Sequence, residues 1–281
     1  MVNVDVILIS YNQEKYIAQA IESILSQKIS DDINVRVIVA DDSSTDKTLE
    51  IIKSYESKSS FNFLYTNYGT NLGYHENYRR TFELCSGDYL AILEGDDWWH
   101  SDKHIIQHVR FLEKHKNISM SFNNIRVFDA SINEVESNYW PYTTDCRYIS
   151  LKQQVLYGNQ IGNLSSCVFR CSLLRTLTEQ FFKTDFADWE LGIWMAQYGD
   201  IVKLKESTST YRVDYKGQWT KLSEEDKKES MINTLDNMDI LTNGMYHKLF
   251  EKGKYNILND IHEKPYRSWK TKIKLFFAIV K

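Results

Sequence analysis

The sequence predicts an α/β fold in which a mostly parallel sheet is flanked by helices and followed by a helical C-terminal extension. Two observations lead to this fold class. Short apolar runs alternate with helical patterns over the first 110 residues, at a spacing typical of right-handed crossovers between parallel strands. From about residue 221 onward the pattern becomes helical and locally charged, which indicates an extension rather than more sheet.

Four strands are predicted in the first part of the chain because apolar, β-branched runs end there in turn residues; they cover 4–9, 35–40, 61–66 and 89–93. Between them, apolar residues recur at helical spacing, which predicts helices over 14–27, 47–54 and 76–84. Further along, the same criteria predict helices at 101–117, 151–157 and 188–198, strands at 167–169 and 201–204, and strands and loops over 118–150.

The composition excludes several classes of protein. A formal net charge of −4 argues against a nucleic-acid partner. The four cysteines lack C-x-x-C spacing and are expected to be reduced, buried thiols. No basic, apolar leader precedes the first strand, and no run of about 20 apolar residues occurs. We therefore expect a cytoplasmic protein, with peripheral contact on the inner face of the plasma membrane as an open alternative.

Polar residues follow three of the predicted strands. They are Ser10-Tyr11-Asn12, Asp41-Asp42 and Glu94-Gly95-Asp96-Asp97. Because ligands of such sheets bind beyond the carboxyl ends of the strands, these residues are expected to meet at one edge. Three carboxylates within four residues repel one another unless a cation or hydrogen bonds compensate. The 94–97 turn therefore predicts an oxygen-ligand site for Mn²⁺ or Mg²⁺, the alternative being a solvated acidic turn.

Three further carboxylates have both a chemical and a structural interpretation. Asp41 and Asp42 are suited to a base N–H or ribose hydroxyls, whereas Asp42 or Asp46 would also cap the helix that follows; we expect both uses. Asp188 begins an amphipathic helix, where it is either a general base or a charge that complements the helix dipole.

Two other patterns are less specific. His100, His104 and His108 repeat every four residues, which resembles half a zinc site; without a partner at fixed spacing, a solvated helix face is the favoured interpretation. Residues 264–281 hold six basic and no acidic residues among aromatic and aliphatic ones. This segment is suited either to anionic lipid headgroups or to packing on the core or a partner, and both interpretations stay open.

Four segments together resemble the family 2 glycosyltransferases of the GT-A fold. They are Val6 to Asn12, Val39 to Asp46, Asn71-Leu72-Gly73, and Gly87 to Trp99. The order and spacing of these segments are specific, and the resemblance is strong over residues 3–115 and visible to about 215. It implies a GT-A domain at 1–215, with a nucleotide-binding part at 1–115 and an acceptor-binding part at 116–215. Residues 216–281 are the helical extension.

The resemblance also implies roles for individual residues. The nucleotide is expected on Ser10, Tyr11, Asn12, Asp41, Asp42, Asn71 and Asp96, with Asp41 on the uracil N–H. Metal ligands are expected among Asp97, Asp96, Glu94 and Asp214; Glu94 stands where Asp is commoner in the family, and Asp214 where a His often stands. Asp188 matches the general base, although Ala187 replaces the usual Glu before it. The acceptor is expected on Asn163, Ser165, Ser166, Trp189 and Glu190.

The function implied is that of a metal-dependent, inverting glycosyltransferase. A nucleotide-sugar donor, most simply a UDP-sugar, would pass its sugar to a saccharide or lipid-linked saccharide acceptor in capsule or lipopolysaccharide synthesis. Two alternatives remain: a nucleotidyltransferase, for which the turn after the first strand lacks a glycine-rich phosphate loop, and a non-catalytic binding module. The C-terminal segment is expected to serve acceptor binding, homodimerisation or membrane contact.

Overall fold

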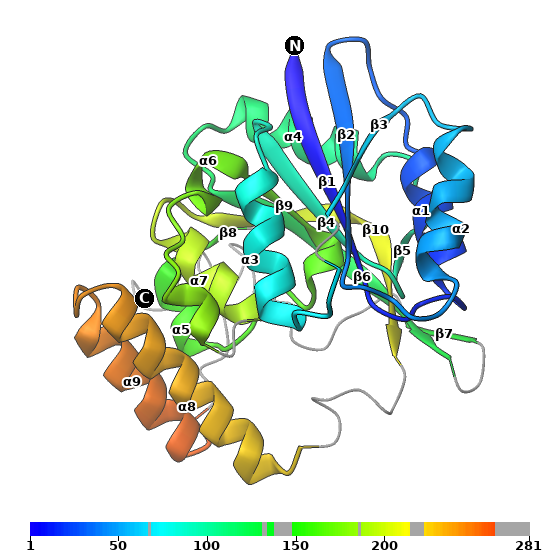
Figure 1. The fold of residues 1–281 in the computed structure, drawn as a ribbon. Coiled ribbons are helices and arrows are strands. Elements are labelled where there is room, and N and C mark those ends of the chain that lie inside the picture. Colours follow the sequence, from blue (N-terminus) through cyan, green and yellow to red (C-terminus); the bar gives the residue numbers. More distant parts are fainter. Residues whose placement is uncertain (67–68, 131–133, 138–147, 185–186, 214–221, 262–281) are drawn as a thin grey trace.

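The computed structural model describes residues 1–66, 69–130, 134–137, 148–184, 187–213 and 222–261. One sheet runs through the molecule, with helices on both faces (Figure 1). Its strands are β1 (Val2–Ser10), β2 (Ile33–Asp41), β3 (Asn62–Tyr65), β4 (Tyr89–Glu94), β5 (Trp98–Trp99), β6 (Met120–Asp129), β7 (Glu134–Ser137), β8 (Tyr148–Ile149), β9 (Cys167–Arg170) and β10 (Ile201–Val213).

Most of the helices among the described residues lie where the apolar periodicity predicts them. They are α1 (Ile17–Leu25), α2 (Thr48–Glu56), α3 (Tyr74–Leu84), α4 (His104–Lys114), α5 (Leu151–Leu156), α6 (Cys171–Leu174), α7 (Asp188–Ala196), α8 (Glu224–Leu241) and α9 (His247–Leu258), with short 3₁₀ turns at Leu164–Ser166 and Phe181–Lys183. Capping boxes fix the first turns of α5, at Ser150 and Gln153, and of α8, at Ser223 and Asp226.

The sheet order is β3-β2-β1-β4-β9-β6-β10-β5. The strands β3, β2, β1 and β4 are mutually parallel, as the strand–helix alternation predicts. Beyond β4 the sheet is mixed, because β9 runs antiparallel to both β4 and β6, whereas β6 and β10 are parallel. The outcome is a mixed α/β fold whose first half is the parallel sheet that the sequence indicates.

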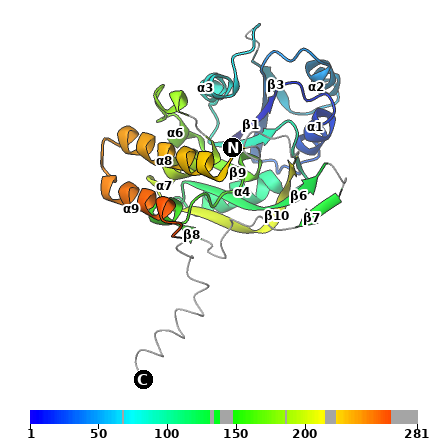
Figure 2. The same cartoon turned by 90° about the horizontal axis from the view of Figure 1, so that it is seen from below.

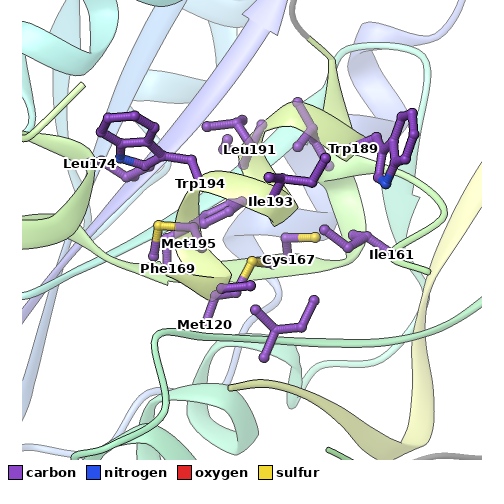
Figure 3. Close-up of a cluster of buried hydrophobic side chains, with 14 of the residues drawn as sticks. Met120, Ile161, Cys167, Phe169, Leu174, Trp189, Leu191, Ile193, Trp194 and Met195 are labelled. Atoms are coloured by element: carbon purple, nitrogen blue, oxygen red, sulfur yellow. The ribbon is translucent and has the colours of Figure 1, made fainter. Parts of the chain in front are cut away.

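The two faces of the sheet bury separate apolar clusters. Alternate residues of the strands point to opposite faces, so that Val6 and Leu8 join one cluster while Ile7 and Ile9 join the other. The Leu8 side packs under α1, α2 and α4, and the Ile7 side packs under α3, α5, α6 and α7. Figure 3 shows part of the second cluster, where α7 lays Leu191, Ile193 and Met195 against β9.

The base of the sheet is tied together by a buried ion pair. The Asp5 carboxylate on β1 receives the Nε and Nη2 atoms of Arg36 on β2, both at 2.9 Å. The same carboxylate accepts from the backbone N–H groups of Ser86 and Gly87, which precede β4. Because Asp5 is only 2% exposed, these four bonds are what make its charge tolerable there.

The helices α8 and α9 pack side by side against α5 and α7. In Figures 1 and 2 this pair lies at the side of the molecule opposite α1 and α2. Gly253 allows the close approach, since a Cβ there would lie 2.8 Å from the Val155 side chain and 2.9 Å from the Leu235 side chain. The helical pattern after residue 221 therefore corresponds to elements that join the main core.

Several sequence-based expectations can be compared with the fold directly. Cys85, Cys167 and Cys171 are free and buried, which confirms the prediction for them, while Cys146 lies outside the described residues. The strand predicted at 201–204 is longer, because the hydroxyl-rich residues that follow continue it to Val213 after a register shift. No helix in the described part of the chain is long and apolar enough to span a membrane.

The solvated helix face predicted for the histidines of α4 is wrong. His104 and His108 are fully buried, and their Nδ1 atoms lie 2.6 Å from Thr208 Oγ1 and 2.8 Å from Ser121 Oγ. His100, at the end of β5, lies 2.9 Å from Thr210 Oγ1. Burial lowers the pKa of His100 to about 4 and of His108 to about 3, so the rings are neutral.

Candidate active site

The parallel strands bring their polar carboxyl ends together, as the topology requires. Ser10 at the end of β1 pairs in register with Asp41 at the end of β2, and Ile9 pairs with Glu94 at the end of β4. The side chains follow the same arrangement, because the Ser10 hydroxyl donates to Asp41 Oδ1 over 3.0 Å. Three separate sequence segments thus meet at one edge of the sheet.

The loops after β1 and β2 are locked to each other. Asn12 and Ser43 have φ angles of 53° and 58°, a left-handed conformation that non-glycine residues adopt at a cost. Asn12 accepts from the Thr45 N–H through its side-chain oxygen, and its own N–H donates to the Ser44 hydroxyl. These bonds keep Asn12 and Ser43 in the left-handed conformation at the sheet edge. Tyr11, beside them, is 45% exposed.

Asp41 and Asp42 are both buried, but they bond to different parts of the chain. Asp41 Oδ2 accepts from the Ser44 N–H at 2.9 Å. Asp42 accepts from the N–H groups of Leu72 and Gly73 at 2.7 and 2.8 Å, so it fixes the loop that leads into α3. Asp46, rather than Asp42, stabilises the first turn of α2, because its Oδ1 accepts from the Thr48 N–H.

The loop that Asp42 holds also carries two residues toward the site. Asn71 donates from its side chain to the Asp42 carbonyl over 3.2 Å. Tyr74 begins α3 and stands near the acidic residues, because the charges of Glu94 and Asp188, after desolvation, raise the pKa of its phenol. Tyr74 as a whole is 44% exposed, and its ring packs edge-on against Tyr78.

The acidic turn after β4 is the most strongly perturbed electrostatic feature of the described residues at this edge. Glu94 and Asp96 are half-buried, and Asp97 is 1% exposed. Desolvation, together with the charge of Asp96, raises the pKa of Asp97 to about 8. The pKa of Glu94 is raised well above its ordinary value by desolvation first, then by the charges of Asp97, Asp96 and Asp188.

Two long-range hydrogen bonds orient Asp97. Its Oδ2 accepts from the Asn163 side chain at 2.6 Å, and its Oδ1 accepts from the Arg212 N–H at 2.8 Å. A further hydrogen bond, with the Ser165 side chain, lowers the pKa of Asp97 and so opposes the effect of burial. Clustered carboxyl oxygens that retain protons at neutral pH suit a hard divalent cation, which would replace those protons. The described residues contain no group of three or more His, Cys, Asp or Glu side chains placed to hold a metal, so phosphate and water oxygens would complete the coordination. Asp214 lies outside the described residues.

Arg212 joins the acidic turn to the rest of the sheet edge. Its guanidinium lies 4.4 Å from the ring centre of Tyr16, 4.7 Å from that of Trp98 and 5.1 Å from that of Phe128. Its Nε donates to the Asp96 carbonyl at 2.7 Å, and its Nη2 donates to the Gln19 side chain on α1. An arginine stacked by three rings is well suited to hold the turn in one conformation.

Asp188 lies at the first turn of α7. Its Oδ2 accepts from the Asn159 side chain at 2.7 Å, and desolvation raises its pKa. The negative charge of Asp188 is also one of the causes that raise the pKa of Glu94 and of Tyr211 on β10. A carboxylate from the second half of the chain therefore shares one electrostatic environment with the strand ends of the first half.

The residues predicted to contact the acceptor are mostly engaged within the protein. Ser165 accepts from the Glu94 N–H, and the Ser166 hydroxyl donates to the Asn163 carbonyl. Trp189 is 6% exposed, and its indole donates to the Gln154 carbonyl. Both Glu190 oxygens accept hydrogen bonds, from the Ala187 N–H and the Thr234 hydroxyl. This placement favours a supporting role for these residues over direct contact with a substrate.

Sequence reasoning gave no role to three side chains that the structure places at the site. Asn159 donates a hydrogen bond to Asp188, desolvation and the charges of Glu94 and Asp188 raise the pKa of Tyr74, and Arg212 donates a hydrogen bond to the Asp96 carbonyl. Only Arg212 could have been suspected from the sequence, because it lies in the 211–214 segment that ends in Asp214, one of the predicted metal ligands. The other two depend on contacts between distant segments, which no local pattern reveals.

The fold, a mixed α/β sheet flanked by helices, matches that of GT-A glycosyltransferase structures. The family model described as Glycosyl transferase family 2 matches residues 5–178, well over half of the chain. The chain therefore belongs to the family 2 glycosyltransferases.

Two relatives give the extent of the similarity. An uncharacterized protein of Mycobacterium tuberculosis is 30% identical over 217 residues, which cover 76% of this chain and 60% of that protein. The UDP-Glc:alpha-D-GlcNAc-diphosphoundecaprenol beta-1,3-glucosyltransferase WfaP of Escherichia coli is 32% identical over 121 residues, 43% of this chain and 45% of WfaP. The chain thus spans only part of the length of the curated relatives that it matches.

Solved structures share the fold at low sequence identity. TarS of S. aureus, in complex with UDP-GlcNAc, has a TM-score of 0.64 and 18% identity, covering 84% of this chain and 66% of that one. The mannosyltransferase PcManGT from Pyrobaculum calidifontis, in complex with GDP-Man and Mn²⁺, has a TM-score of 0.66 and 14% identity, covering 90% and 69%. At these identities the likeness supports the fold.

Proposed function

We propose that the protein is an inverting glycosyltransferase that moves a sugar from a nucleotide-diphosphate donor, most simply a UDP-sugar, to a saccharide or lipid-linked saccharide acceptor in polysaccharide synthesis. The observation that carries this proposal is the shared environment of Asp188 and the acidic turn. A transferase needs a base for the acceptor hydroxyl within reach of the group that binds the diphosphate, and in this proposal Asp188 and the acidic turn would take these two roles.

The chemistry follows from the positions of these side chains. The Asp188 carboxylate takes the proton of the acceptor hydroxyl, and the oxygen forms its bond to the anomeric carbon as the bond to the diphosphate breaks on the opposite face. Configuration at that carbon inverts. Asn159, at 2.7 Å from Asp188, keeps the carboxylate oriented and favours its charged form.

The donor side is handled by the sheet edge. Asp97, oriented by Asn163 and Arg212, would bind a Mn²⁺ or Mg²⁺ ion with one of its neighbours Asp96 or Glu94, and phosphate and water oxygens would complete the coordination. When bound, the cation would neutralise charge that develops on the leaving diphosphate. The loops after β1 and β2, at Ser10 to Asn12 and Asp41, would hold the nucleoside. The structure of PcManGT in complex with GDP-Man and Mn²⁺ supports a nucleotide-sugar donor and a divalent cation for this fold.

The experiment is to mix the purified chain with UDP-Glc, UDP-GlcNAc or GDP-Man and Mn²⁺, with and without saccharide acceptors, and to identify the products. Release of the nucleoside diphosphate, and a glycoside of inverted anomeric configuration by NMR, are the expected results. Release of pyrophosphate would indicate a nucleotidyltransferase instead. Donor binding without any release would indicate a binding module.

For the C-terminal residues 264–281, which lie outside the described part of the chain, we propose contact with anionic lipid headgroups. Their six basic residues and interleaved aromatic residues support this proposal. Co-sedimentation with phosphatidylglycerol vesicles should fall when 264–281 are removed and should fall with salt. Binding that is unaltered by the truncation would contradict the proposal.

A further inference from the structure

Glu190 is a buried carboxyl group that the proposed reaction does not use. It lies two residues after Asp188 on α7 and is 4% exposed. Burial raises the pKa of Glu190 to about 7, so the ionised carboxylate is costly at this position unless hydrogen bonds stabilise it. Placing such a group in the first turn of the helix that carries the base indicates that its partners matter.

Each oxygen of Glu190 has its own partner. Oε2 accepts from the Ala187 N–H at 3.0 Å, which caps the start of α7 from the N3 side, since the Ala187 side chain has no acceptor of its own. Oε1 accepts from the hydroxyl of Thr234, a residue that is 6% exposed and lies on α8. Capping alone needs only the first bond, so the second bond serves a connection between α7 and the C-terminal helices.

The surrounding contacts make this connection rigid. Trp189, between Asp188 and Glu190, donates from its indole to the Gln154 carbonyl on α5 at 2.9 Å. The helix α9 approaches both α5 and α8 so closely that a Cβ on Gly253 would clash with Val155 and Leu235. The first turn of α7 is thus held from three consecutive residues: Asp188 by the Asn159 side chain, Trp189 by α5, and Glu190 by α8.

We propose that Thr234 and Glu190 are positioning residues that set the Asp188 carboxylate, so that the α8–α9 pair is a working part of the active site. The inference rests on the proposed function, because it concerns the placement of the proposed base. Small displacements of a reacting group lower the rate strongly while leaving substrate affinity intact, with about 100-fold for about 1 Å as a guide.

The test compares three variants of the full chain. Thr234→Val keeps the shape and removes the hydroxyl, Thr234→Ser keeps the hydroxyl, and Met238→Ala disturbs a fully buried α8 residue that is not bonded to Glu190. We expect Thr234→Val to lower kcat about 10-fold or more, with the donor KM within about twofold. Thr234→Ser should restore kcat, and Met238→Ala should lower the melting temperature without that loss of kcat.

Hydrogen exchange at residues 187–191, measured by mass spectrometry on the same variants, provides a readout that does not need turnover. Exchange should rise in Thr234→Val and stay near the wild-type level in Thr234→Ser and Met238→Ala. Unchanged exchange in Thr234→Val, or a kcat loss equalled by Met238→Ala, would overturn the positioning role. If the wild type releases no nucleotide from any donor, the proposed function fails, and the exchange data alone decide whether Thr234 holds the start of α7.

Discussion

At the scale of single residues, the site is a set of carboxyl groups kept in unfavourable surroundings. Desolvation raises the pKa values of Glu94, Asp96, Asp97, Asp188 and Glu190. Perturbed carboxyl groups that cluster in this way are typical of functional sites, because structure alone gains little from them. The sequence located four of these groups by their places after strands or before a helix, and it assigned Glu190 a different role.

Replacing Asp188 by Asn should nearly abolish transfer. The amide keeps the shape and the hydrogen-bonding capacity toward Asn159 but cannot accept a proton, and general-base catalysis contributes about 10²–10⁴-fold. The measurement is nucleoside diphosphate release at saturating donor, with the melting temperature as a check of folding. Turnover that stays near the wild-type rate would remove Asp188 from the role of base.

Stability of the metal-free protein should fall between about pH 6.5 and pH 8. Asp97 and Glu190 keep their protons in the folded state up to their pKa values of about 8 and about 7, whereas the unfolded chain loses them near pH 4, so stability falls as pH rises until the folded groups also ionise. Below about pH 6.5 the unfolded chain protonates histidines such as His100 and His108, which stay neutral when folded, and this effect opposes that of the carboxyl groups.

Thermal melting from pH 5 to 8.5 measures how stability depends on pH, and the Asp97→Asn variant serves as the control. Because the amide does not titrate, the decline above pH 6.5 should become shallower in that variant. A melting temperature that rises steadily from pH 6.5 to 8.5 in the wild type would contradict the assignment of raised pKa values to these carboxyl groups.

At the scale of elements, prediction succeeded where a pattern is local and missed what depends on distant partners. Apolar β-branched runs and helical spacing located the parallel strands and the helices between them. The continuation of β10 was missed because its Ser and Thr residues are those of a loop. The histidines of α4 were predicted wrongly because their hydrogen-bonding partners inside the protein, the hydroxyls of Thr208 and Ser121, lie on other elements.

The packing of α7 against α5 should tolerate no added side chain at Gly192. A Cβ there would lie 2.3 Å from Gln154 Nε2 and 2.4 Å from Ile161 Cδ1, so both side chains must shift. We expect Gly192→Ala to lower the free energy of unfolding by about 1–3 kcal/mol, as overpacked cores do. Urea denaturation measures this free energy. As a control, Ser172→Ala at an exposed helical position should change the free energy of unfolding little. Equal stabilities would show that α7 packs less tightly.

At the scale of the whole molecule, one sheet edge collects residues from both halves of the chain. The first half supplies Ser10, Asp41 and the acidic turn, and the second supplies Asn163 and Arg212 to orient Asp97. The sequence predicted that these carboxylates would share an edge, because parallel strands end together. It could not predict the three-ring cage of Arg212 or the bond from α8 to Glu190, since both join segments far apart in the chain.

The most direct test of the account is calorimetric titration of UDP into the wild type, Asp97→Asn and Asp188→Asn, each with Mn²⁺ and with EDTA. The account predicts that Asp188→Asn binds UDP and Mn²⁺ like the wild type, while Asp97→Asn or EDTA weakens UDP binding at least about 10-fold, as loss of a charged ligand group should. Wild-type affinity in Asp97→Asn and in EDTA would contradict a cation-bound nucleotide at this sheet edge.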